Sequence, residues 1–219
     1  MAASEADVVG VERAPQLRGQ ALRRRILEAA RETFLGEGFD ASMDTVAASA
    51  GTTKATVYKH FGNKEALFIA VVEAELDHAL AESVRIVSSR LARSSQFRED
   101  LIEACRAWVN GLAAPDMLRL RNLVAGEQRR FPELGEAWSK RGPGRFHPVI
   151  GDALRELVAQ QRLSIGDIEL AVLQLSGLVV GPHLVYGGYG EPVDGAMREH
   201  LITSGVDMFV DYYRHRANT

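Results

Sequence analysis

The sequence predicts an all-α protein of about nine or ten helices, in which a long helix joins a small N-terminal domain to a larger helical domain. Apolar residues recur at helical spacing along almost the whole chain, and the alternating pattern of a strand is hard to find. Glycine and proline interrupt the pattern after stretches of helical length. The chain has 219 residues, 46% of them hydrophobic, which is enough for one or two domains with a buried core.

Residues 1–17 are expected to form a disordered, acidic arm that ends near Pro15. This start lacks the basic and apolar regions of a secretory signal, and no apolar run reaches the roughly 20 residues that span a bilayer. The single cysteine, Cys105, can form no disulfide within the chain. These features predict a cytoplasmic protein without a membrane partner.

Residues 18–79 are expected to form the N-terminal domain, which opens with a helix. Leu22, Ile26, Ala30 and Phe34 follow one face of this helix, which Gly36 and Gly38 are expected to end. The three consecutive arginines at 23–25 are interpreted as a solvated helix face.

Two short helices follow, and a tight turn joins them. Ser42 is expected to cap the helix MDTVAASA, and Gly51 to end it in a left-handed backbone conformation. Thr52 or Thr53 then caps the helix KATVYKHF, which Gly62 ends. A fourth, long helix begins KEALFIAVV, after a cap at Asn63.

Residues 42–61 therefore form a helix-turn-helix pattern, which is typical of DNA-binding proteins. The major groove of B-DNA is about 12 Å wide and admits one α-helix, whose N-terminal residues reach the base edges. The chain has a net charge of −3, yet the stretch from Thr53 to Lys64 contains basic residues and no acid. The residues expected to contact DNA are Ser42, Thr45, Thr53, Lys54, Thr56, Tyr58, Lys59, His60 and Lys64.

Residues 80–219 are expected to form the second domain, and the stretch SSRLARSSQ at 88–96 is the clearest break before its remaining helices. The pattern predicts helices over 97–113, 115–131, 131–142, 142–163, 166–188 and 195–215. The last two are more apolar than one buried stripe requires, so either the fold encloses them or a second copy of the chain covers them.

Residues 22–67, LRRRILEAARETFLGEGFDASMDTVAASAGTTKATVYKHFGNKEAL, resemble the N-terminal DNA-binding domain of the TetR family of bacterial transcriptional repressors. Thr56, Val57, Tyr58, Phe61, Lys64, Glu65 and Leu67 stand where the family pattern expects them. Thr52 departs from the apolar residue that is commoner at its position. The string EQRRFPELGEAWSKRGPGR is similar to the C-terminal domain of AefR-like members of the family.

The resemblance implies a regulator that binds a palindromic double-stranded DNA operator as a homodimer and needs no cofactor or metal. The residues expected at the dimer interface are Leu170, Leu173, Gly177, Leu178, Gly181, Ile202, Val206, Phe209 and Tyr213. The two glycines are expected to allow helices to approach closely.

The resemblance also implies that residues from about 80 onward bind an effector. Two tryptophans and several other aromatic residues favour a small hydrophobic or aromatic molecule. The residues expected to line its site are Trp108, Leu112, Met117, Leu120, Val124, Phe131, Trp138, Phe146, His147, His183 and Tyr186.

Three other functions are considered besides a repressor. A helical interaction module that has lost DNA binding is disfavoured, because the helix TTKATVYKHF is intact. A transcriptional activator of the same fold stays open, because sequence does not separate the two signs of regulation. An enzyme that uses Cys105 is disfavoured, because the neighbours EACRAWV predict a buried, unreactive thiol. The chain has neither an HExxH metal motif nor a GxGxxG nucleotide loop.

Overall fold

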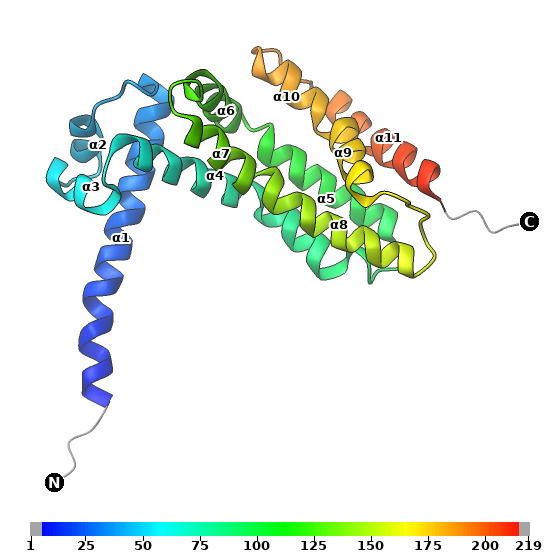
Figure 1. Ribbon diagram of the computed structural model, residues 1–219, viewed down its shortest axis with the longest axis horizontal. Coiled ribbons are helices and arrows are strands. Elements are labelled where there is room, and N and C mark those ends of the chain that lie inside the picture. Colours follow the sequence, from blue (N-terminus) through cyan, green and yellow to red (C-terminus); the bar gives the residue numbers. More distant parts are fainter. Residues whose placement is uncertain (1–5, 215–219) are drawn as a thin grey trace, which may run out of the picture. The chain divides into compact units, whose positions relative to one another are not determined.

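The computed structural model describes residues 6–214, with side chains described from residue 18 onward. Over this range the chain forms eleven α-helices, one π-helical segment and one isolated β-bridge between Leu163 and Arg214 (Figure 1). The predicted all-α fold is confirmed. The chain divides into two compact units at Val71/Val72, inside helix α4 (Lys64–Ile86), whereas the sequence predicted a boundary at residues 79/80. No composition change marks the division, because α4 continues through it.

The N-terminal unit contains α1 (Ala6–Glu37), α2 (Met43–Ser49), α3 (Lys54–Phe61) and the first turns of α4. The expected disordered arm differs from this structure, because the backbone is helical from Ala6 onward; residues 1–5 lie outside the described range. Pro15 lacks the N–H that a helix interior uses, yet good helix formers surround it in the sequence and the helix continues past it.

Three phenylalanines hold the core of this unit together. Phe34 from α1 packs edge-on against Phe68 from α4, with ring centroids 4.9 Å apart, and Phe39 packs edge-on against Phe68 at 5.3 Å. Ile26 and Ala30, on the face predicted from helical spacing, are also fully buried. Aromatic edge-to-face contacts of this kind add to the free energy gained by burial.

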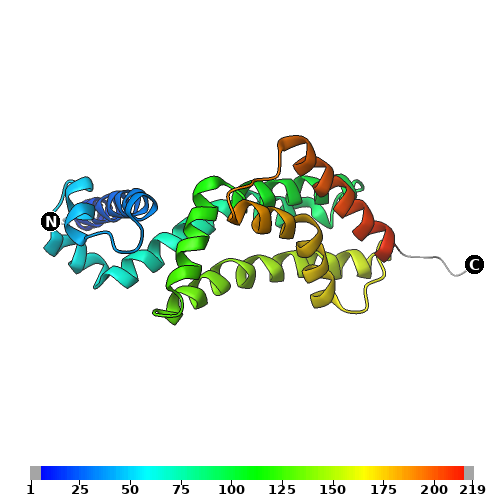
Figure 2. The ribbon, with the colours of Figure 1, turned by 90° about the horizontal axis from the view of Figure 1, so that it is seen from above.

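The second unit is a bundle built from the rest of α4 and the elements that follow it (Figure 2). α11 packs against α5 and α9, while α8 packs against α7, α9 and the π-helical segment η1. The predicted break at 88–96 covers the end of η1 and the turns that follow it. The elements are η1 (Val87–Leu91), α5 (Phe97–Leu112), α6 (Pro115–Glu127), α7 (Pro132–Arg141), α8 (Pro143–Ala159), α9 (Ile168–Val179), α10 (Gly181–Gly188) and α11 (Gly195–Tyr213).

The single helix predicted over 166–188 is wrong, because the structure divides this stretch into α9 and α10, which are bent by 46°. Pro182 explains the break: a proline inside a helix removes one hydrogen bond and clashes with the preceding turn. No single described helix has the length and apolar character to cross a membrane, and only α9 and α10 taken together pass that test.

Candidate nucleic-acid interface and ligand cavity

Side-chain caps fix both helices of the helix-turn-helix, as the sequence predicted. The Ser42 hydroxyl accepts a hydrogen bond from the Thr45 N–H at 3.0 Å, and the Thr53 hydroxyl accepts one from the Thr56 N–H at 3.2 Å. In each pair the two hydroxyl oxygens also lie 2.9 Å apart. Since one hydroxyl of each pair donates to the other, each pair keeps one O–H that can donate to an acceptor outside the protein.

The turn between the helices depends on a backbone that only glycine adopts easily. Gly51 has a φ of 61°, in the left-handed region, and lets the chain reverse between α2 and α3. Behind the turn, Val46, Ala47 and Val57 are buried, so one face of each short helix is fixed against the core.

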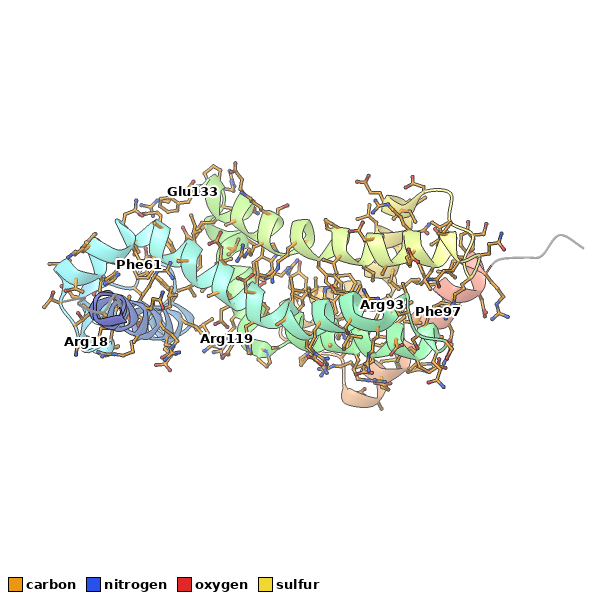
Figure 3. All side chains as sticks on the ribbon, turned by 90° about the horizontal axis from the view of Figure 1, so that it is seen from below. Arg18, Phe61, Arg93, Phe97, Arg119 and Glu133 are labelled. Carbon is orange, nitrogen blue, oxygen red and sulfur yellow. The ribbon has the colours of Figure 1, made fainter. Side chains whose placement is uncertain are left out.

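The three arginines at 23–25 are exposed, as expected, and two of them also contact the helix-turn-helix. The Arg25 guanidinium donates hydrogen bonds to the carbonyls of Ala50 at 2.5 Å and Gly51 at 3.3 Å, at the C-terminal end of α2. The Arg23 guanidinium packs over the ring of Phe61, 4.9 Å from its centre. The position of Phe61 in the N-terminal unit can be followed in Figure 3. No local pattern predicts the Arg25 contact, because its partners lie 25 and 26 residues away in the chain.

The nine residues predicted to contact DNA all belong to the N-terminal unit. Ser42, Thr53, Lys54, Tyr58 and Lys59 are exposed, and Thr45, Thr56, His60 and Lys64 are partly buried. The Lys64 ammonium lies 4.8 Å from the centre of the Phe39 ring, so this side chain packs on the core aromatics in the unbound protein.

An acid missed by the sequence analysis lies on this surface. Asp44, in the first turn of α2, accepts a hydrogen bond from the Lys54 ammonium at 2.7 Å, and this contact raises the pKa of Lys54. An acid in a first helical turn is ordinary, because it faces the positive end of the helix dipole, so the sequence alone does not single it out.

Comparison with known proteins agrees with this geometry. The family profile for the N-terminal domain, described as bacterial regulatory proteins of the tetR family, matches residues 26–71. A second profile, described as the C-terminal domain of AefR-like transcriptional repressors, matches residues 99–215, which is more than half of the chain. The chain belongs to the TetR family. It is therefore a helix-turn-helix transcriptional regulator and not an enzyme.

Individual TetR-family relatives cover different shares of the chain. The regulator UidR of Escherichia coli K12 is 43% identical over 67 residues, so the match spans 30% of this chain and 34% of UidR. The structure of a TetR-family regulator from Mesorhizobium loti has a TM-score of 0.84 and 27% identity, covering 90% of this chain and 98% of that one. The structure titled flavonoid-responsive regulator FrrA has a TM-score of 0.74 and 28% identity, covering 90% and 100%.

The C-terminal unit of this TetR-family protein contains a cavity of about 110 Å³. Five of the predicted effector-site residues line it, namely Trp108, Leu112, Trp138, Phe146 and His147. Met117, Leu120, Val124 and His183 are buried but are not among its lining residues, Phe131 is partly buried elsewhere, and Tyr186 is 57% exposed. The lining residues that the sequence analysis missed are Leu76, Leu80, Gly142, Pro143, Ser176, Val180 and Leu184.

Of the two histidines predicted at the effector site, His147 lines the cavity and His183 does not. His147 lies edge-on to Trp108, with ring centroids 6.1 Å apart, and burial lowers its pKa. His183 is 2% exposed, and its Nε2 has no hydrogen-bond partner among the described residues. Burial, together with the nearby charge of Arg198, lowers the pKa of His183. Both imidazoles are therefore favoured in the neutral form.

The predicted dimer residues divide into an outward and an inward set. Leu170, Leu173 and Gly177 are exposed, and Leu178 and Gly181 are partly buried. Ile202, Val206, Phe209 and Tyr213 are buried within the chain itself, because they form the face of α11 that packs on α5 and α9. The outward face of α11 instead carries Met208 and Tyr212, which are 61% and 74% exposed.

The close approach expected at Gly177 and Gly181 concerns the dimer interface and stays a prediction; within the chain, α9 and α11 approach closely at Gly205. An added Cβ at Gly177 would have nothing within 4 Å, whereas one at Gly205 would lie 3.1 Å from Val179. Gly177 instead lines an open groove of about 410 Å³ between α9 and α11, whose other lining residues are Gln174, Leu178, Met208, Phe209, Tyr212 and Tyr213.

Cys105 is 1% exposed on α5, and burial raises the pKa of its thiol to about 12. At neutral pH the thiol is protonated and shielded from solvent, which is the opposite of a reactive cysteine. Within residues 18–214, no three His, Cys, Asp or Glu side chains come together as metal ligands would.

Proposed function

We propose that this TetR-family protein is a homodimeric repressor that binds a palindromic DNA operator in the cytoplasm and is released by a small hydrophobic or aromatic effector. The observation that carries the proposal is the construction of α3. Thr53 caps its start and Val57 anchors its inner face, which leaves Lys54, Tyr58 and Lys59 exposed. This is the arrangement that a helix needs to enter the major groove.

The roles follow from position along α3. Lys54 and Thr56 lie in the first turn, so we assign them to base edges, which the N-terminal residues of a recognition helix reach. The residues further along the chain are assigned to phosphates, namely Tyr58, Lys59, His60 and Lys64. The hydroxyls of Ser42, Thr45 and Thr53 are assigned to phosphates as well. For Lys64, a phosphate contact requires the ammonium to leave the face of the Phe39 ring.

The exposed apolar groove between α9 and α11 supports the homodimer. Leu173, Met208 and Tyr212 each expose more than half of their side-chain surface next to Gly177. A contiguous apolar surface of this kind usually marks an interface, and a second copy of the same groove covers it with two-fold symmetry. A two-fold dimer places two recognition helices on successive turns of DNA, about 34–36 Å apart or further.

The cavity supports an effector that acts by displacing helices. Sites for small ligands usually measure about 300–1,000 Å³, whereas this cavity measures about 110 Å³. A larger guest must therefore push the walls apart, and one of those walls is α4, through Leu76 and Leu80. The response of FrrA to flavonoids, which are aromatic, supports the same class of effector here.

Polar contacts beside the cavity couple α4 to the other walls. The Asp77 carboxylate on α4 accepts hydrogen bonds from Arg141 of α7, at 2.7 Å and 2.5 Å, and from Arg145 of α8. An effector that binds more tightly when α4 is displaced shifts the protein toward that arrangement and so lowers its affinity for DNA. The size of this decrease is limited by the difference between the effector's affinities for the displaced and the undisplaced arrangement. Because α4 is shared by both units, it is the element through which this difference acts.

Selection from random DNA tests the proposal directly. The purified chain and a Lys54→Ala/Tyr58→Ala variant are each incubated with a pool of random duplexes at a fixed salt concentration, and the retained DNA is sequenced. We expect the native chain to enrich an inverted repeat and the variant to enrich none. Retention of unselected sequence by the native chain would refute operator recognition.

The sign of regulation is tested separately, with the recovered repeat placed over a promoter that drives a reporter. We expect the chain to lower expression, in line with the AefR-like repressor profile that its C-terminal unit matches. Raised expression from the same arrangement would favour the activator reading.

A further inference from the structure

The ion pair between Asp44 and Lys54 joins the two helices of the helix-turn-helix on the surface assigned to DNA. The Lys54 Nζ lies 2.7 Å from Asp44 Oδ2, and the two side chains are 48% and 68% exposed. A pair this exposed to water contributes little to folding. The ion pair therefore matters mainly for which groups of DNA the Lys54 ammonium can bind.

Lys54 occupies the first position of α3, where a basic side chain can reach a base edge. In the unbound protein its ammonium is held by α2, and the Asp44 carboxylate cancels its charge. Affinity for arbitrary DNA comes from cations that neutralise phosphates and release counterions. A lysine that keeps its carboxylate partner adds nothing to that release, so the pair reduces binding to arbitrary sequence.

A G·C base pair can replace each half of the ion pair. In the major groove guanine presents the acceptors O6 and N7, which suit the Lys54 ammonium, and cytosine presents an N4 amino donor, which suits the Asp44 carboxylate. We propose that Asp44 is a specificity-determining residue that withholds Lys54 from phosphates and releases it to guanine at a G·C pair of the operator. This inference rests on the proposed function, because it assumes that α3 reads DNA.

Substitution of Asp44 by Asn tests the inference, since Asn keeps the shape of the side chain and removes its charge. Dissociation constants are measured for the selected operator and for a scrambled duplex of the same composition, across a salt series. One additional phosphate-neutralising lysine steepens the salt dependence of log K by about 0.9 per subunit. We therefore expect Asp44→Asn to bind the scrambled duplex about fivefold to tenfold more tightly for each bound subunit near 0.1 M salt, with a smaller gain on the operator.

Two controls separate this effect from a general change of charge. Asp40, in the loop between α1 and α2, is exposed and forms no ion pair with any described residue, so Asp40→Asn removes the same charge without freeing a lysine. We expect Asp40→Asn to leave the ratio of operator to scrambled affinity unchanged. In a Lys54→Ala background, Asp44→Asn is expected to behave like Asp40→Asn, because no ammonium remains to be released.

The random-duplex selection, repeated with Asp44→Asn, gives a second readout. The variant is expected to enrich half-sites with a weaker preference for G·C at one position. An unchanged motif, an unchanged affinity ratio, or the same response with Lys54→Ala would overturn the inference while leaving the proposed function intact. If the native chain itself distinguishes no sequence, the proposed function fails and this inference fails with it.

Discussion

The two units of this chain are built from different kinds of contact. In the N-terminal unit the candidate contacts are polar and are fixed by close neighbours in the sequence, as where Ser42 and Thr53 each cap the helix that follows. In the C-terminal unit the cavity takes its walls from residues between Leu76 and Leu184, on six helices. The candidate contacts of the N-terminal unit can therefore be predicted from the local sequence. The cavity of the C-terminal unit depends on contacts between segments that are distant in the sequence.

Because of this difference, substitutions are expected to affect the two units in different ways. A change among the candidate DNA contacts of the N-terminal unit is expected to leave the core intact, because none of these nine residues is buried. A change in the C-terminal unit alters packing between helices, and its effect depends on whether the changed side chain faces the core or the solvent.

The largest effect is expected at the exposed apolar face of α9. Leu173→Glu places a charge beside the groove between α9 and α11 and, since Leu173 is 54% exposed, leaves the fold of the subunit unchanged. We expect the dimer to dissociate, and operator affinity to fall by about 100-fold or more because the second half-site no longer binds intramolecularly. Sedimentation velocity and operator binding measure the two effects.

A matched change outside the groove is Tyr189→Glu, in the loop after α10, where the side chain is 89% exposed. It is expected to leave both the mass and the operator affinity unchanged. A Leu173→Glu protein that still sediments as a dimer would place the interface on another surface.

The second effect concerns the approach of α4 to α5. A Cβ added at Gly111 would lie 2.0 Å from the backbone oxygen of Ala79, so Gly111→Ala must move one helix away from the other. We expect a loss of about 1–3 kcal/mol in the free energy of unfolding, measured by urea denaturation. Gly126→Ala on α6, where nothing lies within 4 Å, is expected to raise stability by about 0.5–1 kcal/mol. Equal stability of the two variants would contradict the close approach.

Gly51 and Gly111 also explain what the sequence could and could not predict. Gly51 follows a short amphipathic helix and precedes a capping threonine, so its left-handed turn was predicted from its neighbours. Gly111 lies inside a helix, and glycine is needed there because the backbone of another helix lies close to it. No local sequence pattern reveals that neighbour. The same holds for Arg25, whose partners lie across the unit.

The last helix illustrates a second limit. On α11 both Phe209 and Met208 are apolar, and the sequence cannot tell which apolar stripe faces the core. The stripe chosen from helical spacing was the buried one, and the exposed Met208 and Tyr212 were missed. Most helices were predicted well, because caps, glycines and prolines mark their ends; the exceptions are the bend at Pro182 and the helical backbone before residue 18, which was expected to be disordered.

The third effect is local to the N-terminal unit. Thr53→Ala removes the hydroxyl that accepts from the Thr56 N–H at the start of α3, and a lost helix cap costs about 1 kcal/mol. We expect faster hydrogen exchange at the first amides of α3 and little change in the C-terminal unit. Thr53→Ser keeps the hydroxyl and is expected to restore protection. Equal exchange in all three proteins would show that the cap does not stabilise α3.

The smallest effect is a pH dependence carried by His183 in the C-terminal unit. Burial and Arg198 lower its pKa in the folded chain, so as the pH falls below the ordinary histidine value the unfolded chain takes up a proton that the folded chain does not. Stability is therefore complete above that value and declines below it. We expect the thermal midpoint of the native protein to fall between pH 7.5 and pH 5.5 (roughly one unit on either side of an unperturbed histidine), and the fall to be shallower in His183→Gln. His78→Gln, on an exposed face of α4, is the matched control and should keep the native slope. If His183→Gln and His78→Gln depend on pH to the same degree, the buried imidazole does not carry the effect.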